Sequence, residues 1–132
     1  MRDYGRIKDI IKNAESIVFF GGAGVSTESG IPDFRSSDGI YNRAQDGEGE
    51  RPEYILSHGF LMEEPESFWS YYRRNMLYPD AVPSITHRIL AAAEKEGNLS
   101  AVITQNIDGL HQMAGSETVI ELHGSSHKNY CV

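Results

Sequence analysis

The 132-residue sequence is poor in several features, and each shortage excludes a class of protein. Its one cysteine, Cys131, can form no disulfide within the chain, which favours a reducing compartment. Lysine and arginine number 12 against 19 aspartates and glutamates, for a net charge of -7, whereas nucleic-acid binding needs clustered cations. The first residues are charged and amphipathic, without the continuous apolar run of a signal peptide or membrane span. We therefore expect a cytoplasmic protein with neither a nucleic-acid nor a membrane partner.

What the sequence does contain is typical of a folded domain. Hydrophobic residues make up 39% of the chain and aromatic residues 10%, which is ordinary for a soluble globular protein and argues against disorder. The length fits one domain or part of one. No internal repeat or low-complexity tract interrupts it.

Alternating patterns of hydrophobicity predict helices and strands in turn. Ile7, Ile10, Ile11 and Ala14 recur at helical spacing and predict a first helix with one buried face. Further helices are predicted at 65–77 and 83–96, the latter ended by Gly97. A β-rich run at 16–20 that stops at glycines predicts a buried parallel strand, and two more β-rich runs, which end in polar residues, predict strands at 99–104 and 118–122. Ser26, Thr27 and Glu28 offer capping groups for a helix after the first strand.

This alternation predicts an α/β fold, a doubly wound parallel sheet with helices on both faces. In such sheets ligands bind beyond the carboxyl ends of the strands. The segments that follow the three predicted strands, 21–24, 105–108 and 123–124, should therefore converge on one crevice. The long aperiodic segment from about 33 to 50 is interpreted as a loop that covers a cofactor.

The first of these segments has the composition of a phosphate-binding turn. Gly22, Ala23 and Gly24 lie between a strand and a predicted helix, where glycines let the backbone approach a pyrophosphate. A plain strand-to-helix turn would use the same residues, so both interpretations stay open. The dehydrogenase pattern is incomplete, because Thr27 replaces its third glycine and no acidic residue follows a second strand to hold a ribose.

The turn after Gly30 presents three chemically different side chains in succession. Asp33, Phe34 and Arg35 could line a ring pocket and meet a phosphate. The simpler alternative is a proline turn with a local pair between Asp33 and Arg35.

The two later segments supply polar groups suited to a nucleotide. Gln105, Asn106 and Asp108 could hold ribose hydroxyls and a carboxamide by hydrogen bonds, although Asp108 could instead cap a short helix. His123, at the end of a predicted strand, is a candidate general base. The other histidines are interpreted as structural, with His87 supporting the site from behind: His58, His87, His111 and His127.

Taken together, four motifs closely resemble those of the sirtuin family, in the family's order and nearest to its bacterial members. They are Gly22–Ser26, Ser29–Ser36, Thr104–His111 and Glu121–Gly124. The resemblance implies a Rossmann-like NAD-binding domain with a small zinc module. It further implies an NAD-dependent deacetylase of acetylated protein lysines, which transfers the acyl group to ADP-ribose and releases nicotinamide.

The resemblance also implies a role for each matching residue. His123 would be the general base and would act with Asn106 and Asp108 as the catalytic group. Phe34, Ile107 and Asp108 would form the nicotinamide pocket, while Gln105 and Asn106 would hold the nicotinamide ribose and a water. The remaining cofactor-binding residues would meet the phosphates and ribose or line the pocket: Gly22, Ala23, Gly24, Thr27, Asp33 and Arg35.

The sequence departs from the family pattern at three places. Pro83–His87 reads Pro-Ser-Ile-Thr-His where many sirtuins have Pro-Asn-Ala-Ala-His. Ser70 with Arg73 stands where desuccinylating relatives carry a Tyr-x-x-Arg pair, which favours deacetylation. Cys131 resembles the start of the first Cys-x-x-Cys pair, but a structural zinc site needs four ligands.

We therefore expect residues 1–132 to be the amino-terminal, NAD-binding part of a sirtuin catalytic domain. The sheet would be incomplete at its carboxyl end, the zinc module would be cut off from about residue 131, and the fragment would be inactive by itself. Two other hypotheses stay open. One is a nicotinamide-dependent oxidoreductase, and the other is a non-catalytic nucleotide-binding fragment or partner module.

Overall fold

The computed structural model describes residues 4–43 and 51–130. Cys131 and the expected start of a zinc module lie outside the described residues, as does the stretch 44–50 of the predicted loop. In chain order the elements are α1 (Tyr4–Asn13), β1 (Ile17–Gly21), the 3-10 turns η1 (Ala23–Val25) and η2 (Thr27–Ser29), α2 (Ile40–Arg43), α3 (Pro52–Ile55), α4 (His58–Glu63), α5 (Pro65–Asn75), α6 (Ile85–Lys95), β2 (Leu99–Thr104), α7 (Leu110–Ala114) and β3 (Val119–Glu121).

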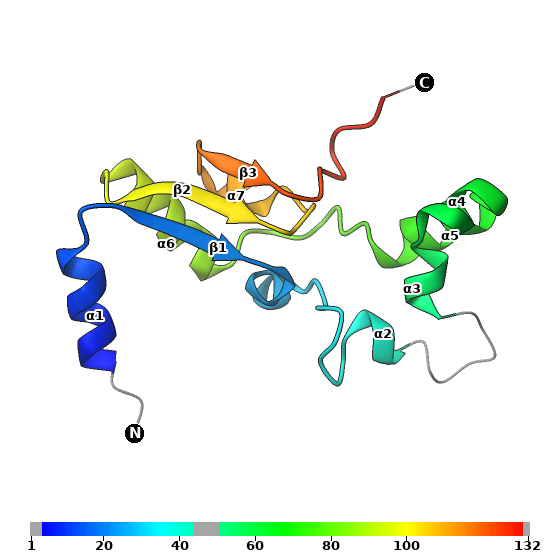
Figure 1. Ribbon diagram of the computed structural model, residues 1–132, viewed down its shortest axis with the longest axis horizontal. Coiled ribbons are helices and arrows are strands. Elements are labelled where there is room, and N and C mark those ends of the chain that lie inside the picture. The colour runs from blue at the N-terminus through cyan, green and yellow to red at the C-terminus, as the bar shows by residue number, and fades with distance from the viewer. Residues whose placement is uncertain (1–3, 44–50, 131–132) are drawn as a thin grey trace.

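The three strands form one parallel sheet in the order β1-β2-β3, which confirms the predicted parallel α/β sheet (Figure 1). The helices expected on both faces cover only one face among the described residues. The register pairs Phe19 with Val102, and Val102 with Val119. Side chains of paired residues share a face of the sheet. Val102 is completely buried because α6 and α7 pack against this face.

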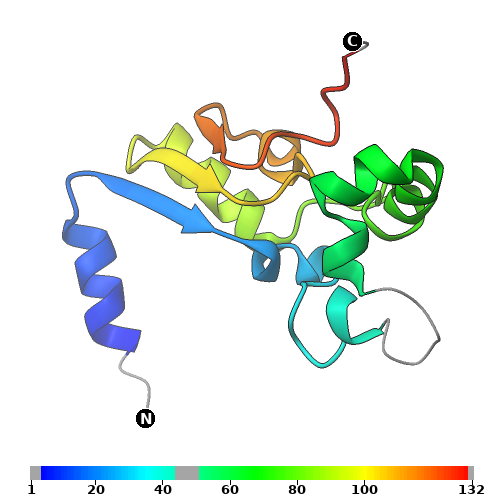
Figure 2. The ribbon, with the colours of Figure 1, turned by 45° about the vertical axis from the view of Figure 1, so that its right-hand side comes forward.

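The opposite face of the sheet is bare in the part of the chain that the structure describes. Phe20 pairs with Ile103, and Ile103 with Ile120, and Phe20 and Ile120 are 60% and 48% exposed. The sequence predicts a buried strand at 16–20, and this prediction is wrong for Val18 and Phe20. Both figures place α6 and α7 behind the same side of the sheet (Figures 1 and 2).

Helix α1 forms as predicted, but its expected buried face is exposed. None of its residues is buried, and Ile10 is 61% exposed. Figures 1 and 2 both show α1 standing apart from the sheet and from α6 and α7. Periodicity shows that a helix can bury a stripe, but burial also requires a neighbour, and no described element packs closely against this stripe.

Helix α6 confirms the prediction at 83–96 and is fixed at both ends. A capping box at Ser84 and His87 starts it, and Gly97, with a φ of 84°, follows its end. Near that end the Glu94 carboxylate accepts hydrogen bonds from the backbone N–H groups of Glu117 and Thr118, at 3.0 and 2.7 Å. The helix is thereby tied to the start of β3.

Two local predictions are corrected by the structure. The chain after β1 forms the short turns η1 and η2 in place of an α-helix, because the Ser26 side chain hydrogen-bonds to Asp108 and does not cap. The short helices α2, α3 and α4 had not been predicted. Of these, α4 begins at a cap in which the Ser57 hydroxyl accepts from the N–H of Phe60, at 3.2 Å.

Candidate functional site

A cavity of about 640 Å³ opens at the carboxyl ends of the strands, where the sequence predicted a crevice. Part of its lining comes from residues that follow β1, β2 and β3, and the rest from residues 31–41, from Leu56 after α3, and from α5 and the chain after it. The cavity brings together these predicted site residues: Ala23, Phe34, Gln105, Asn106, Ile107, Asp108 and His123.

At the centre of the cavity wall, the Ser26 hydroxyl joins two polar side chains of the segment after β2. It donates to Asp108 Oδ2 at 2.6 Å and accepts from Asn106 Nδ2 at 3.0 Å. Ser26 is completely buried, and Asn106 is nearly so. Each amide or carboxylate is thus held in one orientation, which leaves part of its hydrogen-bonding capacity for a ligand.

Asp108 combines two roles that the sequence left as alternatives. Its Oδ1 accepts from the N–H of Leu110, the first residue of α7, at 3.0 Å, while Gly109 occupies the N-cap position itself. Its Oδ2 accepts from Ser26, and the residue lines the cavity. The cap and the pocket position are therefore compatible, because each uses a different carboxylate oxygen.

The His123 imidazole is oriented by the neighbouring strand end. Its Nδ1 lies 3.1 Å from the carbonyl oxygen of Gln105. Because a carbonyl can only accept, Nδ1 carries the proton in the neutral ring, and Nε2 keeps its lone pair. The side chain is exposed and lines the cavity. This arrangement suits a general base that must take a proton from a ligand.

Two buried histidines lie behind this wall. His87 and His111 are fully buried, and their ring centroids are 4.6 Å apart. Burial lowers the pKa of both histidines, while the negative charge of Asp108 partly opposes this effect. His87 also lowers the pKa of His111. Burial thus favours the neutral form of both rings. That His87 supports the wall from behind stays a prediction.

Five other predicted residues do not line the cavity: Gly22, Gly24, Thr27, Asp33 and Arg35. The Thr27 hydroxyl donates locally to the carbonyl of Gly24, at 2.9 Å. Hydrogen bonds from the hydroxyl and N–H of Ser36 hold the pKa of Asp33 below its usual value. Within the described residues no Asp33–Arg35 ion pair forms.

Among the lining residues that the sequence did not predict, three make side-chain hydrogen bonds to the segment after β2. Ser26 lies in a quoted motif, but its hydroxyl was interpreted as a helix cap. Ser126 and His127 line the cavity and contact the segment after β2. No periodicity or motif marks them, and His127 was assigned the default structural role. Their hydrogen bonds join residues 19 apart in the sequence.

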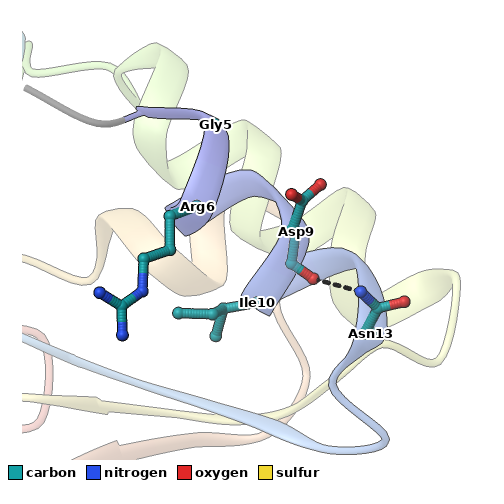
Figure 3. Close-up of a pocket in the computed structure, with 5 residues that line it drawn as sticks. All are labelled: Gly5, Arg6, Asp9, Ile10 and Asn13. Carbon is teal, nitrogen blue, oxygen red and sulfur yellow. Dashed lines mark hydrogen bonds between the residues drawn. The ribbon is translucent and has the colours of Figure 1, made fainter.

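A second hollow is lined by α1 alone: Gly5, Arg6, Asp9, Ile10 and Asn13 (Figure 3). No other element contributes to it, so it brings together no distant side chains. Among the described residues, no three histidine, cysteine, aspartate or glutamate side chains could hold a metal ion, and no helix is long and apolar enough to cross a membrane.

The fold and cavity define an α/β protein of the Rossmann-like class with a cavity at the carboxyl ends of its strands. The model of the Sir2 family matches residues 22–132, and the chain belongs to this family. The resemblance to sirtuins is thereby confirmed.

Bacterial relatives and solved structures agree with this assignment. An NAD-dependent protein deacetylase of Clostridium perfringens is 54% identical over 127 residues, which cover 96% of this chain and 52% of the relative. A deacetylase of the same description from Cutibacterium acnes is 56% identical over 122 residues, covering 92% and 50%. The chain spans about half the length of the curated relatives it matches.

Two solved structures show the same arrangement. A histidine-to-alanine variant of Sir2 with deacetylated p53 peptide and 3'-O-acetyl ADP-ribose has a TM-score of 0.81 at 38% identity, covering 94% of this chain and 48% of that one. A Sir2 homologue in complex with NAD has a TM-score of 0.78 at 39% identity, covering 94% and 46%.

Proposed function

We propose that this chain supplies the nicotinamide-side pocket and the general base of an NAD-dependent protein lysine deacetylase. One observation carries the proposal: the Ser26–Asp108–Asn106 cluster lines the same cavity as His123, whose Nδ1 is bonded to the Gln105 carbonyl so that Nε2 is the ring nitrogen available to a ligand. The relatives support the proposed reaction, because they are described as NAD-dependent protein deacetylases. A solved structure supports the proposed cofactor, because it is described as an NAD complex.

The chemistry of the cavity wall fits the nicotinamide end of NAD. Phe34 and Ile107 offer apolar surface for a ring, and Gln105, Asn106 and Asp108 offer amide and carboxylate groups for a carboxamide and ribose. When bound, NAD supplies the ribose that accepts the acyl group, and nicotinamide leaves. We assign the phosphates to Gly22, Ala23, Gly24, Thr27 and Arg35, and the pocket rim to Asp33.

The side chains have distinct roles in this proposal. The Asp108 carboxylate accepts from the N–H of the nicotinamide carboxamide, and Asn106 holds the adjacent ribose. His123 Nε2 removes a proton from a ribose hydroxyl so that the oxygen can attack the acyl group. A positioned base of this kind contributes about 10²- to 10⁴-fold to the rate.

The proposed substrates are acetylated lysines of cytoplasmic proteins. Ser70 and Arg73 are exposed on α5, and neither lines the cavity. The side chain of Arg73 donates to the backbone carbonyl of Trp69. Arg73 therefore places no positive charge in the cavity to bind an acidic acyl group. This favours acetyl-lysine over succinyl-lysine as the substrate. The sequence holds one cysteine, so it cannot supply the two Cys-x-x-Cys pairs of the family's zinc module, and no step depends on zinc.

A chimaera tests this function, with the chain replacing the matching residues of the C. perfringens relative. The parent chimaera should release nicotinamide and deacetylate an acetyl-lysine peptide in the presence of NAD, as followed by mass spectrometry. His123→Ala should lower the rate at least about 100-fold while NAD affinity changes less than about threefold, because the base acts after NAD is seated. His58→Ala, at an exposed histidine outside the cavity, is the matched control.

Two results would contradict the proposal. Activity of the His123 variant within about tenfold of the parent would remove His123 from the general-base role, since this is less than such a base usually contributes. Hydride transfer by the parent without nicotinamide release would support an oxidoreductase.

A further inference from the structure

The segment after β3 makes a series of hydrogen bonds to the backbone of the segment after β2. Leu122 N–H donates to the carbonyl of Thr104 and continues the sheet by one bond. Beyond it, the His123 ring donates to the carbonyl of Gln105. Ser126 then donates to the carbonyl of Ile107 twice, from its N–H at 2.9 Å and from its hydroxyl at 2.7 Å.

The series ends at the residue that carries the pocket carboxylate. His127 Nε2 lies 2.9 Å from the carbonyl oxygen of Asp108, and Nε2 must be the donor because a carbonyl only accepts. The His127 ring also lies against Gly109, where an added Cβ would come within 2.8 Å of the ring carbon Cδ2. Gly109 has a φ of 70°, so this contact and the backbone conformation both require glycine.

The segment that carries His127 is held in place by its own hydrogen bonds. The Ser125 hydroxyl accepts from the N–H of His127, and the side chain of Asn129 donates to the carbonyl of Ser126. Lys128 Nζ pairs with Glu121 Oε2 at 3.3 Å, which joins the segment back to β3. A donor placed on such a preorganised segment can fix the group that it contacts.

We propose that His127, assisted by Ser126, is a positioning residue that sets the direction in which the Asp108 carboxylate faces the cavity. Asp108 would then be fixed at its carboxylate by Ser26 and the Leu110 N–H, and at its carbonyl by His127. Removing the His127 donor frees the peptide plane between Asp108 and Gly109. The carboxylate can then turn away from both Leu110 and the nicotinamide carboxamide. The ligand effect rests on the function proposed above, whereas the effect on Asp108 does not.

Hydrogen exchange of the Leu110 amide measures the position of Asp108 without any ligand, because this amide donates to Asp108 Oδ1. His127→Phe keeps a ring against Gly109 but removes the donor. His127→Gln restores an N–H donor. We expect His127→Phe to accelerate Leu110 exchange roughly three- to tenfold, the effect of losing one ordinary hydrogen bond, and His127→Gln to exchange at nearly the parent rate. The Val102 amide, which donates to the carbonyl of Thr118, and the variant His58→Ala are controls.

The same variants are then titrated with nicotinamide and with ADP-ribose, followed by amide chemical shifts. His127→Phe should weaken nicotinamide binding by a similar factor, and His127→Gln should rescue it. ADP-ribose, which lacks the carboxamide, should bind all variants alike.

The outcomes separate the two proposals. Unchanged Leu110 exchange in His127→Phe, equal acceleration at Val102, or failure of His127→Gln to rescue would overturn the positioning role. Local acceleration at Leu110 in a chain whose parent binds neither nicotinamide nor ADP-ribose would support the positioning role and contradict the proposed function.

Discussion

The sheet has two contrasting parts, the polar end where its strands stop and the apolar face opposite α6 and α7. At the strand ends, Ser26, Asn106 and Asp108 are joined by hydrogen bonds between side chains some 80 residues apart. On the bare face, Phe20 and Ile120 stay about half exposed or more, although both are strongly hydrophobic. Residue type alone therefore does not decide burial, since buried serine and exposed phenylalanine occur within one short stretch of chain. The partner available at each position decides it.

The largest difference in stability is expected between a substitution on the covered side of the sheet and one on its bare face. Leu110 is 1% exposed, and Leu110→Ala should reduce the free energy of unfolding by about 2–5 kcal/mol, through lost burial and the cavity left behind. Ile120→Ala, on the bare face, should cost less than about 1 kcal/mol because much of its surface already meets water. Urea denaturation of both variants checks this, and equal losses would show that the bare face is covered in solution.

A smaller loss is expected at the polar end. Ser26→Ala leaves Asp108 Oδ2 and Asn106 Nδ2 without their shared partner and should cost roughly 1.5–3 kcal/mol, the range for hydrogen bonds to charged groups. Ser29→Ala is a matched control, because the buried Ser29 hydroxyl has no hydrogen-bond partner in the structure. If the two variants unfold at the same urea concentration, the Ser26 network contributes nothing to stability.

Acidification should act on the helices that cover the sheet, because His87 lies on α6 and His111 on α7. His87 and His111 have pKa values below the ordinary 6.5 because burial disfavours the charged ring. The unfolded chain therefore takes up protons at a higher pH than the folded chain does. Their contribution to stability is complete above pH 6.5 and is lost as the pH falls below it. The urea midpoint should thus be lower at about pH 5.5 than at about pH 7.5.

Variants of single histidines assign this pH dependence. His111→Gln should flatten the change in midpoint between the two pH values, whatever its effect at the higher one, and His58→Gln should leave the change intact. Asp33 and Glu94 do not contribute to this pH dependence. Their pKa values are lowered from 3.8 and 4.5, so they titrate in a more acidic range. A pH dependence that is undiminished in His111→Gln would assign the acid sensitivity to His87 or to groups outside this pair.

The smallest effect is expected on α1. Ile10→Gln removes an exposed apolar side chain and should change the free energy of unfolding by less than about 0.5 kcal/mol. The same change should reduce any self-association of the chain, since exposed apolar patches favour it. Analytical ultracentrifugation together with urea denaturation separates the two effects. A loss comparable to that of Leu110→Ala would mean that α1 packs against another element in solution.

Much of the fold could be predicted because its information is local. The run 99–104 is β2 to the residue, and Gly97 follows α6 as expected of a helix stop. The failures come from tertiary context. The stripe on α1 has the right period but no neighbour, and Ser26, which could have capped a helix, bonds to a residue 82 positions away.

The candidate site shows the same division. The parallel topology correctly brought residues 105–108 and His123 to one cavity, because the carboxyl ends of parallel strands meet at one edge. His127 could not be found in this way. Its role depends on a side-chain bond to a backbone carbonyl, and carbonyls are present at every position of a sequence.

The carboxylate of Glu94 has a consequence for the geometry of the whole sheet. Strand β3 has only three residues, and a slip by one position would exchange Val119 and Ile120 between the covered and the bare face. Glu94 accepts from the two N–H groups just before the strand, so a rigid helix fixes the point at which pairing starts. A side chain of helix α6, which lies outside the sheet, therefore fixes the register of this short edge strand.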